Sequence, residues 1–408
     1  MTQRAARLAW WLYDWACSAF NTVVVTFVFA AYFVRAVATD PVQGTAEWAA
    51  AQTVAGLVIA VASAPLGTVA DRGGYRRSML AGFATIMVLC TAGLWFVRPH
   101  PDAVLLALVL VAGATIAAEF AFVFYNAMLP DIASPGRIGR VSGIGWGMGY
   151  AGGLICLALC LTLLIDPKPP LFGLTAGEAQ PVRATTLFAA GWIAIFAWPV
   201  VVFGPSQQRP RGRAPRIYWR ALRDAGVLRF LLARMLYTDG LTTLFAFGGI
   251  FAAGTFGMGA RETLLLGIAL NLTAGLGAAV FALIEDRIGA RPVVLIAVAA
   301  LAVLGMSLLL VRSVQWFWVL ALALGVFVGP AQAASRSLMA RLAPAGSRNA
   351  YFGLYALSGR VTGFIGPMAL GAVTAAMGSQ RAGMGVIVVL LAAGGLLLAT
   401  TRLAVTSG

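Results

Sequence analysis

Long runs of apolar residues, separated by short charged segments, make up most of the sequence. A helix needs about 20 mostly apolar residues to cross the hydrocarbon core of a bilayer. The pattern predicts twelve such helices. Their approximate ranges are 8–36, 46–70, 78–97, 103–128, 141–165, 184–204, 227–255, 262–284, 292–311, 316–340, 350–376 and 383–403. We therefore expect an all-α integral membrane protein.

The two halves of the sequence resemble each other at three places. The pattern D-R-x-G-x-R occurs at residues 71–76 and again, 215 residues later, at 286–291. L-Y-D at 12–14 matches L-Y-T-D at 236–239, and three widely spaced glycines recur on the fifth and eleventh helices, where tight packing is expected. The glycines are Gly143, Gly149 and Gly153, then Gly353, Gly359 and Gly363. Such repeats predict two pseudo-symmetric six-helix bundles, the usual architecture of a secondary transporter.

The predicted domains are therefore a first bundle at 1–204, an Arg-rich linker at 205–226 and a second bundle at 227–408. The linker is interpreted as a tether beside anionic headgroups. A regulatory partner site there is the alternative.

The D-R-x-G-x-R segments have a conformational interpretation. Their glycines permit a tight reversal between helices. Their aspartates can cap the next helix or pair with an Arg across the half. Ion pairs that break when the halves rock apart would favour an outward-facing state; a plain charged turn is the alternative. The gating candidates are Asp71, Arg72, Gly74, Arg76, Asp286, Arg287, Gly289 and Arg291.

Composition and charge support the membrane interpretation. The chain is 61% hydrophobic and 11% charged, which excludes an ordinary soluble domain. Its net charge of +15 is spread over loops, which argues against a nucleic-acid partner. Loops on the amino-terminal side hold eighteen basic residues, and the opposite loops and helix ends hold seven. This distribution predicts an inner-membrane protein with both termini in the cytoplasm. The expected partners are the lipid bilayer and a small-molecule substrate, and a monomer is expected.

No reactive or metal-binding set is apparent. The four cysteines lie in apolar runs, and Cys156 and Cys160 share a helix face without a nearby His or carboxylate. We interpret them as packing residues and expect no metal, cofactor or catalytic residue. No cleavable signal peptide is expected, because the first apolar run is too long and no small-residue cleavage site follows it.

Ionisable residues inside spans are functional candidates by default. Asp14, Ser18 and Asn21 follow helical spacing, so this polar stripe is either a substrate or proton site or a structural ion pair. Glu119, with Asn126 on the same face, is either a proton carrier or the partner of an Arg such as Arg336 or Arg360.

Asp239 is the counterpart of Asp14 in the second half. Other polar and aromatic groups could complete a cavity for a small polar or zwitterionic ligand, although packing is the alternative for each aromatic. These candidates are Trp146, Tyr150, Thr243, Asn271, Gln332, Tyr355 and Ser358. The candidates for ion pairs at helices and loops are Asp131, Arg140, Arg336 and Arg360.

The paired D-R-x-G-x-R segments and twelve helices resemble the major facilitator superfamily. Y-D-W-A-C-S-A-F at 13–20 resembles the opening of its vacuole-effluxer-like branch, which includes the autophagy-related vacuolar amino-acid effluxer of fungi. Further matches are Y-N-A-M-L-P-D-I at 125–132, I-G-R-V-S-G at 138–143, M-L-Y-T-D-G at 235–240, S-R-S at 335–337 and Y-A-L-S-G at 355–359. Cys17 and Thr238 depart from the Asn often found there.

The resemblance implies a carrier with alternating access and no ATP. The function hypothesis is a secondary active or facilitative transporter of a small polar solute, with amino acids as candidate cargo and protons as candidate coupling ion. A non-transporting sensor or scaffold on a carrier fold, and a lipid or drug exporter, are the alternatives.

Overall fold

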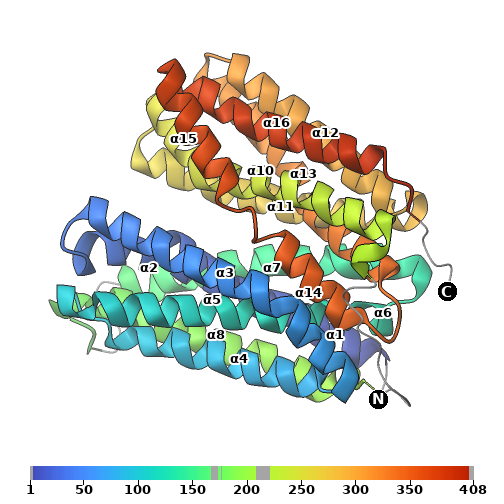
Figure 1. The fold of residues 1–408 in the computed structure, drawn as a ribbon. Helices are drawn as coiled ribbons and strands as arrows, with labels where there is room; N and C mark the ends of the chain where they lie inside the picture. Colours follow the sequence, from blue (N-terminus) through green and yellow to red (C-terminus); the bar gives the residue numbers. More distant parts are fainter. Residues whose placement is uncertain (1–2, 167–172, 176, 208–220, 404–408) are drawn as a thin grey trace. The chain divides into compact units, whose positions relative to one another are not determined.

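The computed structural model describes residues 3–166, 173–175, 177–207 and 221–403, and every regular element in these ranges is helical (Figure 1). Within them, eleven helices are long and apolar enough to cross a membrane, by length and composition. Most of the predicted linker, residues 208–220, lies outside the described part of the chain.

The helices of the first half follow the predicted ranges closely. The first span begins as α1 (Gln3–Ala19) and continues through a π-helix (Phe20–Phe27), α2 (Phe29–Tyr32) and a second π-helix (Phe33–Val37). The other elements are α3 (Pro41–Gly73), α4 (Arg76–Gly93), α5 (Val104–Asn126), α6 (Leu129–Ile132), α7 (Ile138–Cys160) and α8 (Gln180–Phe203).

The second half contains one departure from the prediction. Its elements are α10 (Ala225–Phe256), α11 (Ala260–Ile288), α12 (Ala290–Leu310), α13 (Val314–Leu342), α14 (Arg348–Ser358), α15 (Ile365–Met377) and α16 (Gln380–Ala399). The continuous helix expected at 350–376 is wrong, because residues 359–364 form turns between α14 and α15. Pro367 supplies a reason: in an unbroken helix its ring would clash with the carbonyl of Gly363.

Contacts divide the chain into two compact units. Unit 1 comprises residues 1–59, 74–128 and 148–208, and unit 2 comprises 60–73, 129–147 and 209–408. In unit 1, α8 packs on α1 and α4, and α4 also packs on α5. In unit 2, α13 packs on α11 and α12, and α16 packs on α10, α12 and α15. Unit 2 also holds the end of α3, α6 and the first part of α7, so it joins segments of both sequence halves.

Most of the repeated glycines lie where helices approach closely. In unit 1, a Cβ atom on Gly149 of α7 would lie 2.8 Å from the hydroxyl oxygen of Ser18 on α1. In unit 2, a Cβ atom on Gly143 would lie 2.6 Å from the carbonyl oxygen of Ala278 on α11. Gly363 differs, since it lies in the break and meets only its own turn.

Candidate functional site

The two D-R-x-G-x-R segments make equivalent contacts in unit 2. Gly74 and Gly289 adopt positive φ angles of 69° and 92°, which permit the reversal between helices. Asp71 is fully buried and accepts hydrogen bonds from Asn349 Nδ2 at 2.7 Å and from the Ala350 amide at 2.8 Å. It therefore caps α14, in the second half of the sequence, rather than the helix that follows it.

Asp286 repeats this arrangement with the halves exchanged. Its carboxylate accepts from the Arg140 amide at 3.1 Å and lies 3.6 Å from Arg140 Nε, in the first turn of α7. Each segment thus places an aspartate at the start of the fifth helix of the other sequence half. The anionic side chain suits that position, because a helix start carries unpaired N–H groups and a positive partial charge.

The arginines of these segments bind helix ends of their own half. Arg76 donates to the Ala127 carbonyl at 2.8 Å, and Arg77 donates to the Val202 carbonyl at the end of α8 at 2.7 Å. Arg291 donates to the Ala399 carbonyl at the end of α16 at 2.8 Å. Arg77, rather than the motif residue Arg76, is therefore the structural equivalent of Arg291. Arg72 and Arg287 are exposed.

Further polar contacts surround the aspartates in unit 2. Asp131 of α6 pairs with Arg348 at the start of α14. Arg336 of α13 is only 2% exposed and donates to the carbonyl and hydroxyl oxygens of Ser142 at 2.6 and 3.0 Å. Its guanidinium carbon lies 5.5 Å from the ring centre of Trp146, a cation–π distance.

Glu285 of α11 is a buried carboxylate that the sequence reasoning missed. It accepts from the Ser337 hydroxyl, and a Cβ atom on Gly139 would lie 2.8 Å from its Oε1 atom. Its place next to Asp286 at the end of an apolar run was the available signal. Ser142 and Asn349 were missed as well, since each is a single polar residue near the start of a helix and belongs to no polar stripe in the sequence.

A second polar cluster lies where α10 passes α14 in unit 2. The Arg234 guanidinium stacks on the Tyr355 ring, with 3.5 Å between its carbon and the ring centre. It also donates to the Tyr355 carbonyl at 2.6 Å and to the Ser358 hydroxyl at 2.7 Å. Tyr237 shares a 2.7 Å hydrogen bond with Ser335 of α13. Two of the residues in this cluster, Tyr355 and Ser358, were predicted from the sequence.

Asp239 lies further along α10, against the start of α15. One carboxylate oxygen accepts from the Gly366 amide at 3.0 Å, and Asp239 is 3% exposed. Thr243, one turn later, is fully buried, and its hydroxyl faces the same glycine. Among the described residues, neither the second oxygen of Asp239 nor the Thr243 hydroxyl has a hydrogen-bond partner.

The remaining candidates are more dispersed. In unit 1, Asp14 is buried on α1, Asn21 is exposed in the π-helix that follows, and Ser18 faces α7. The π-helix, whose hydrogen bonds span five residues, interrupts the expected stripe. Glu119 and Asn126 lie on α5, the latter at its buried end.

Four other candidates lie on α7, α11 and α13 and in the break after α14. Asn271 donates to the Gly267 carbonyl of its own helix at 2.8 Å. Tyr150 is half-buried on α7 in unit 1, and Gln332 on α13 in unit 2 is also half-buried. Arg360 lies in the break between α14 and α15.

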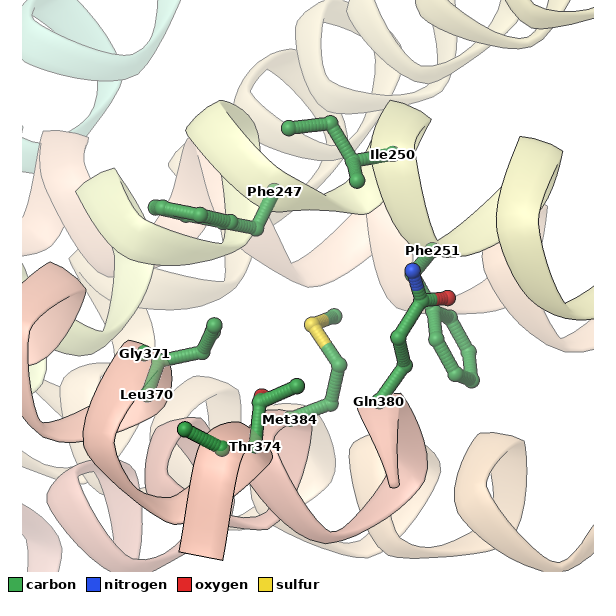
Figure 2. A pocket seen from close by; sticks show the side chains of 9 residues that line it. Phe247, Ile250, Phe251, Leu370, Gly371, Thr374, Gln380 and Met384 are labelled. Atoms are coloured by element: carbon green, nitrogen blue, oxygen red, sulfur yellow. The ribbon is translucent and has the colours of Figure 1, made fainter. Parts of the chain in front are cut away.

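An apolar cavity of about 280 Å³ lies between α10, α15 and α16, within unit 2 (Figure 2). Phe247 and Met384 face it from α10 and α16, and Leu370 and Thr374 line it from α15. Phe247 is one turn beyond Thr243, and Leu370 is one turn beyond Gly366. The cavity therefore begins about 6 Å along the same seam that holds Asp239.

Comparison with known proteins identifies the family. The model of the vacuole effluxer Atg22-like family matches residues 48–405. The chain belongs to this Atg22-like family. It is 25% identical over 405 residues to the uncharacterized MFS-type transporter YxiO of Bacillus subtilis, covering 96% of this chain and 93% of that protein. It is 24% identical to autophagy-related protein 22-1 of Phaeosphaeria nodorum, covering 80% of this chain and 70% of that protein.

Solved structures confirm the fold of this Atg22-like chain. The transporter FucP in its outward conformation matches with a TM-score of 0.77 and 13% identity, over 98% of this chain and 99% of that one. The proton:xylose symporter XylE matches with a TM-score of 0.75 and 11% identity, over 97% and 94%. These structures confirm the predicted major facilitator fold. The family model and the YxiO match confirm the vacuole-effluxer-like branch, so the chain is a multi-pass membrane transporter rather than an enzyme.

Proposed function

We propose that this Atg22-like transporter carries a small polar solute across the cytoplasmic membrane by alternating access, with proton coupling. The observation that carries the proposal is the polar contact of Arg234 with Tyr355 and Ser358, with the buried Asp239 five residues further along the mostly apolar α10. Polar groups inside a span are costly and mark solute or ion pathways in transporters. A guanidinium and a carboxylate on one helix suit a zwitterion, so amino acids are the first cargo to test.

The contacts of Asp71 and Asp286 support a gate. Both aspartates tie the start of a fifth helix to the other sequence half, and both bonds must break if those segments separate. We infer that they hold the carrier closed on the face that bears the D-R-x-G-x-R segments, and that the arginine distribution makes this face cytoplasmic. Predicted roles for Asp14 and Glu119 in coupling belong to the same proposal.

Reconstituted vesicles test the proposal. Purified protein is placed in proteoliposomes with a pH difference, and accumulation of radiolabelled amino acids, sugars and nucleosides is measured. We expect accumulation of one class and its loss when the pH difference is collapsed. Glu119→Gln should remove the pH dependence at unchanged protein content, whereas Asp102→Asn, at an exposed carboxylate before α5, should behave as wild type.

Two results would count against parts of the proposal. Flux of a polar solute that ignores pH in both wild type and Glu119→Gln would remove proton coupling but keep facilitated transport. Ligand binding without flux for any tested solute would support the sensor alternative instead.

The cavity of Figure 2 favours a second candidate, an exporter of apolar compounds. Its lining is almost entirely aliphatic and aromatic. The same vesicles, loaded with a fluorescent apolar cation, test this function. Export of the dye that Met384→Trp blocks, together with no polar flux, would favour it.

A further inference from the structure

We propose that Asp239 is a proton-binding site whose charge decides whether the start of α15 stays attached to α10. The proposal deepens the proposed function, on which it rests, by naming a coupling group and the element that it moves. It stands on the helix break, the cross-helix cap and the unpaired oxygens beside it.

The break creates a need for a cap. A helix that begins inside a membrane has amide groups without an intrahelical acceptor, and water is not available to bind them. Phe364, the residue that precedes α15, provides no side-chain cap. The Gly366 amide is bound by Asp239 from another helix instead, at 3.0 Å.

The cap depends on charge. An ionised carboxylate at a helix start is favoured by the helix dipole, and hydrogen bonds to charged groups are the stronger ones. A protonated Asp239 would lose the dipole interaction and accept a weaker bond from Gly366. Burial at 3% exposure makes the charged form depend on that one interaction.

A proton also has a place to bind. The second oxygen of Asp239 and the Thr243 hydroxyl are both buried without a partner among the described residues. Both atoms face the Cα of Gly366, since a Cβ atom there would lie 3.0 Å from Asp239 Oδ1 and would overlap the Thr243 hydroxyl. A proton on that second oxygen would therefore displace no hydrogen bond of the described residues.

Few other ionisable groups on the surrounding helices could bind the proton in place of Asp239. The elements that pack on α10 are α11, α13, α14, α15 and α16. Away from helix ends, their described ionisable side chains are Arg336 on α13 and two tyrosines on α14, with Arg360 in the break. On α10 itself, Arg234 lies five residues before Asp239 and is bound to Tyr355 and Ser358. The α16 face opposite Gly240 is apolar, formed by Ile387, Leu390 and Leu391.

Release of α15 would have a defined consequence. Gly366 and Thr243 meet in the seam between α10 and α15. Phe247 and Leu370, one turn further along these helices, line the cavity of Figure 2. If the start of α15 moves away, this seam opens and joins Asp239 to the cavity. Proton binding at Asp239 would then open a path between Asp239 and the cavity.

Hydrogen–deuterium exchange of the full-length protein in nanodiscs tests the proposal without any cargo. Exchange in peptides that cover 359–371 is measured at pH 5.5 and 8.5 and corrected for the intrinsic exchange rate. We expect a rise of about tenfold or more at low pH in wild type, as expected for loss of a charged hydrogen bond. Asp239→Asn should show the high rate at both pH values.

The matched control is Glu262→Gln, which alters an acid that caps α11 in the same unit and should exchange as wild type. Equal corrected protection at both pH values in wild type would overturn the proposal, even if the Asn variant failed to fold. Wild-type protection in Asp239→Asn at high pH would overturn it too. Because no solute is transported, either failure leaves the transport proposal standing.

Discussion

Three buried carboxylates show how single residues organise the apolar helices of this transporter. Asp71, Asp239 and Glu285 are each at most 3% exposed, and each accepts a hydrogen bond from another helix or its first turn. A buried carboxylate without such partners would be strongly unfavourable. Each is therefore tied to one arrangement of its neighbours, which makes it sensitive to movement of those neighbours.

Removal of the Asp71 side chain should destabilise unit 2. Asp71→Ala leaves the Asn349 amide groups and the Ala350 amide without their acceptor. Unsatisfied buried donors typically reduce stability by about 1–3 kcal/mol, so we expect a clearly lower melting temperature for the purified protein. Asp102→Ala, at an exposed acid, is the control and should melt as wild type. Equal melting of the two variants would mean that the cap contributes nothing to the folded state.

Gly289 should tolerate no side chain. It has φ 92° and ψ 161°, a region that only glycine occupies readily. Gly289→Ala should reduce stability by about 1–3 kcal/mol, the usual range for such backbone strain. Gly346→Ala is the matched control, since a Cβ atom there meets open space and its φ is not positive. Thermal melting of both variants decides the matter, and an unchanged Gly289→Ala protein would refute the strain argument.

At the scale of elements, sequence reasoning recovered the spans but not their interruptions. Apolar runs report which segments can sit in lipid, and among the described residues they located every span except the one predicted at 350–376 within a few residues. They do not report backbone hydrogen bonding, so the break at 359–364 and the π-helix at Phe20–Phe27 went unseen. Pro367 alone did not signal the break, because Pro65, Pro199 and Pro330 lie inside unbroken helices. The partners of Asp71 and Asp239 were not predictable, because they lie 278 and 127 residues away in sequence.

Two glycines on α3 should respond to the same substitution in opposite ways. A Cβ atom on Gly67 would overlap the Asn349 carbonyl and lie 2.8 Å from the Ala350 amide nitrogen, whereas one on Gly56 meets open space. Gly67→Ala should therefore destabilise the protein by about 1–3 kcal/mol, as overpacking does. Gly56→Ala should be neutral or stabilising by up to about 1 kcal/mol, from helix propensity.

Comparing the melting temperatures of these two variants separates the effect of the contact between helices from the effect of helix propensity. Similar melting temperatures for both variants would indicate that Gly67 of α3 does not lie in close contact with the start of α14.

At the scale of the molecule, the repeat acquires a physical meaning. Asp71 contacts the start of α14 and Asp286 contacts the start of α7, so equivalent residues make equivalent contacts with the halves exchanged. The equivalence is not residue for residue, since Arg77 and Arg291, one position apart in the motif, bind the last helix of each half. Which face of the membrane carries these contacts follows only from loop charge, and that prediction can be tested directly.

Cysteine labelling of intact cells should place the D-R-x-G-x-R face in the cytoplasm. In a variant with its four native cysteines replaced, single cysteines are introduced by Gly136→Cys, Gly346→Cys and Asp102→Cys, at exposed positions in short turns. Asp102 lies at the start of the span Pro101–Ile132, and Gly136 lies just beyond its other end. A membrane-impermeant maleimide should label Asp102→Cys in intact cells, but the two glycine positions only after permeabilisation. The reverse pattern would place the aspartate caps on the outer face, and they would then hold the carrier closed to the outside.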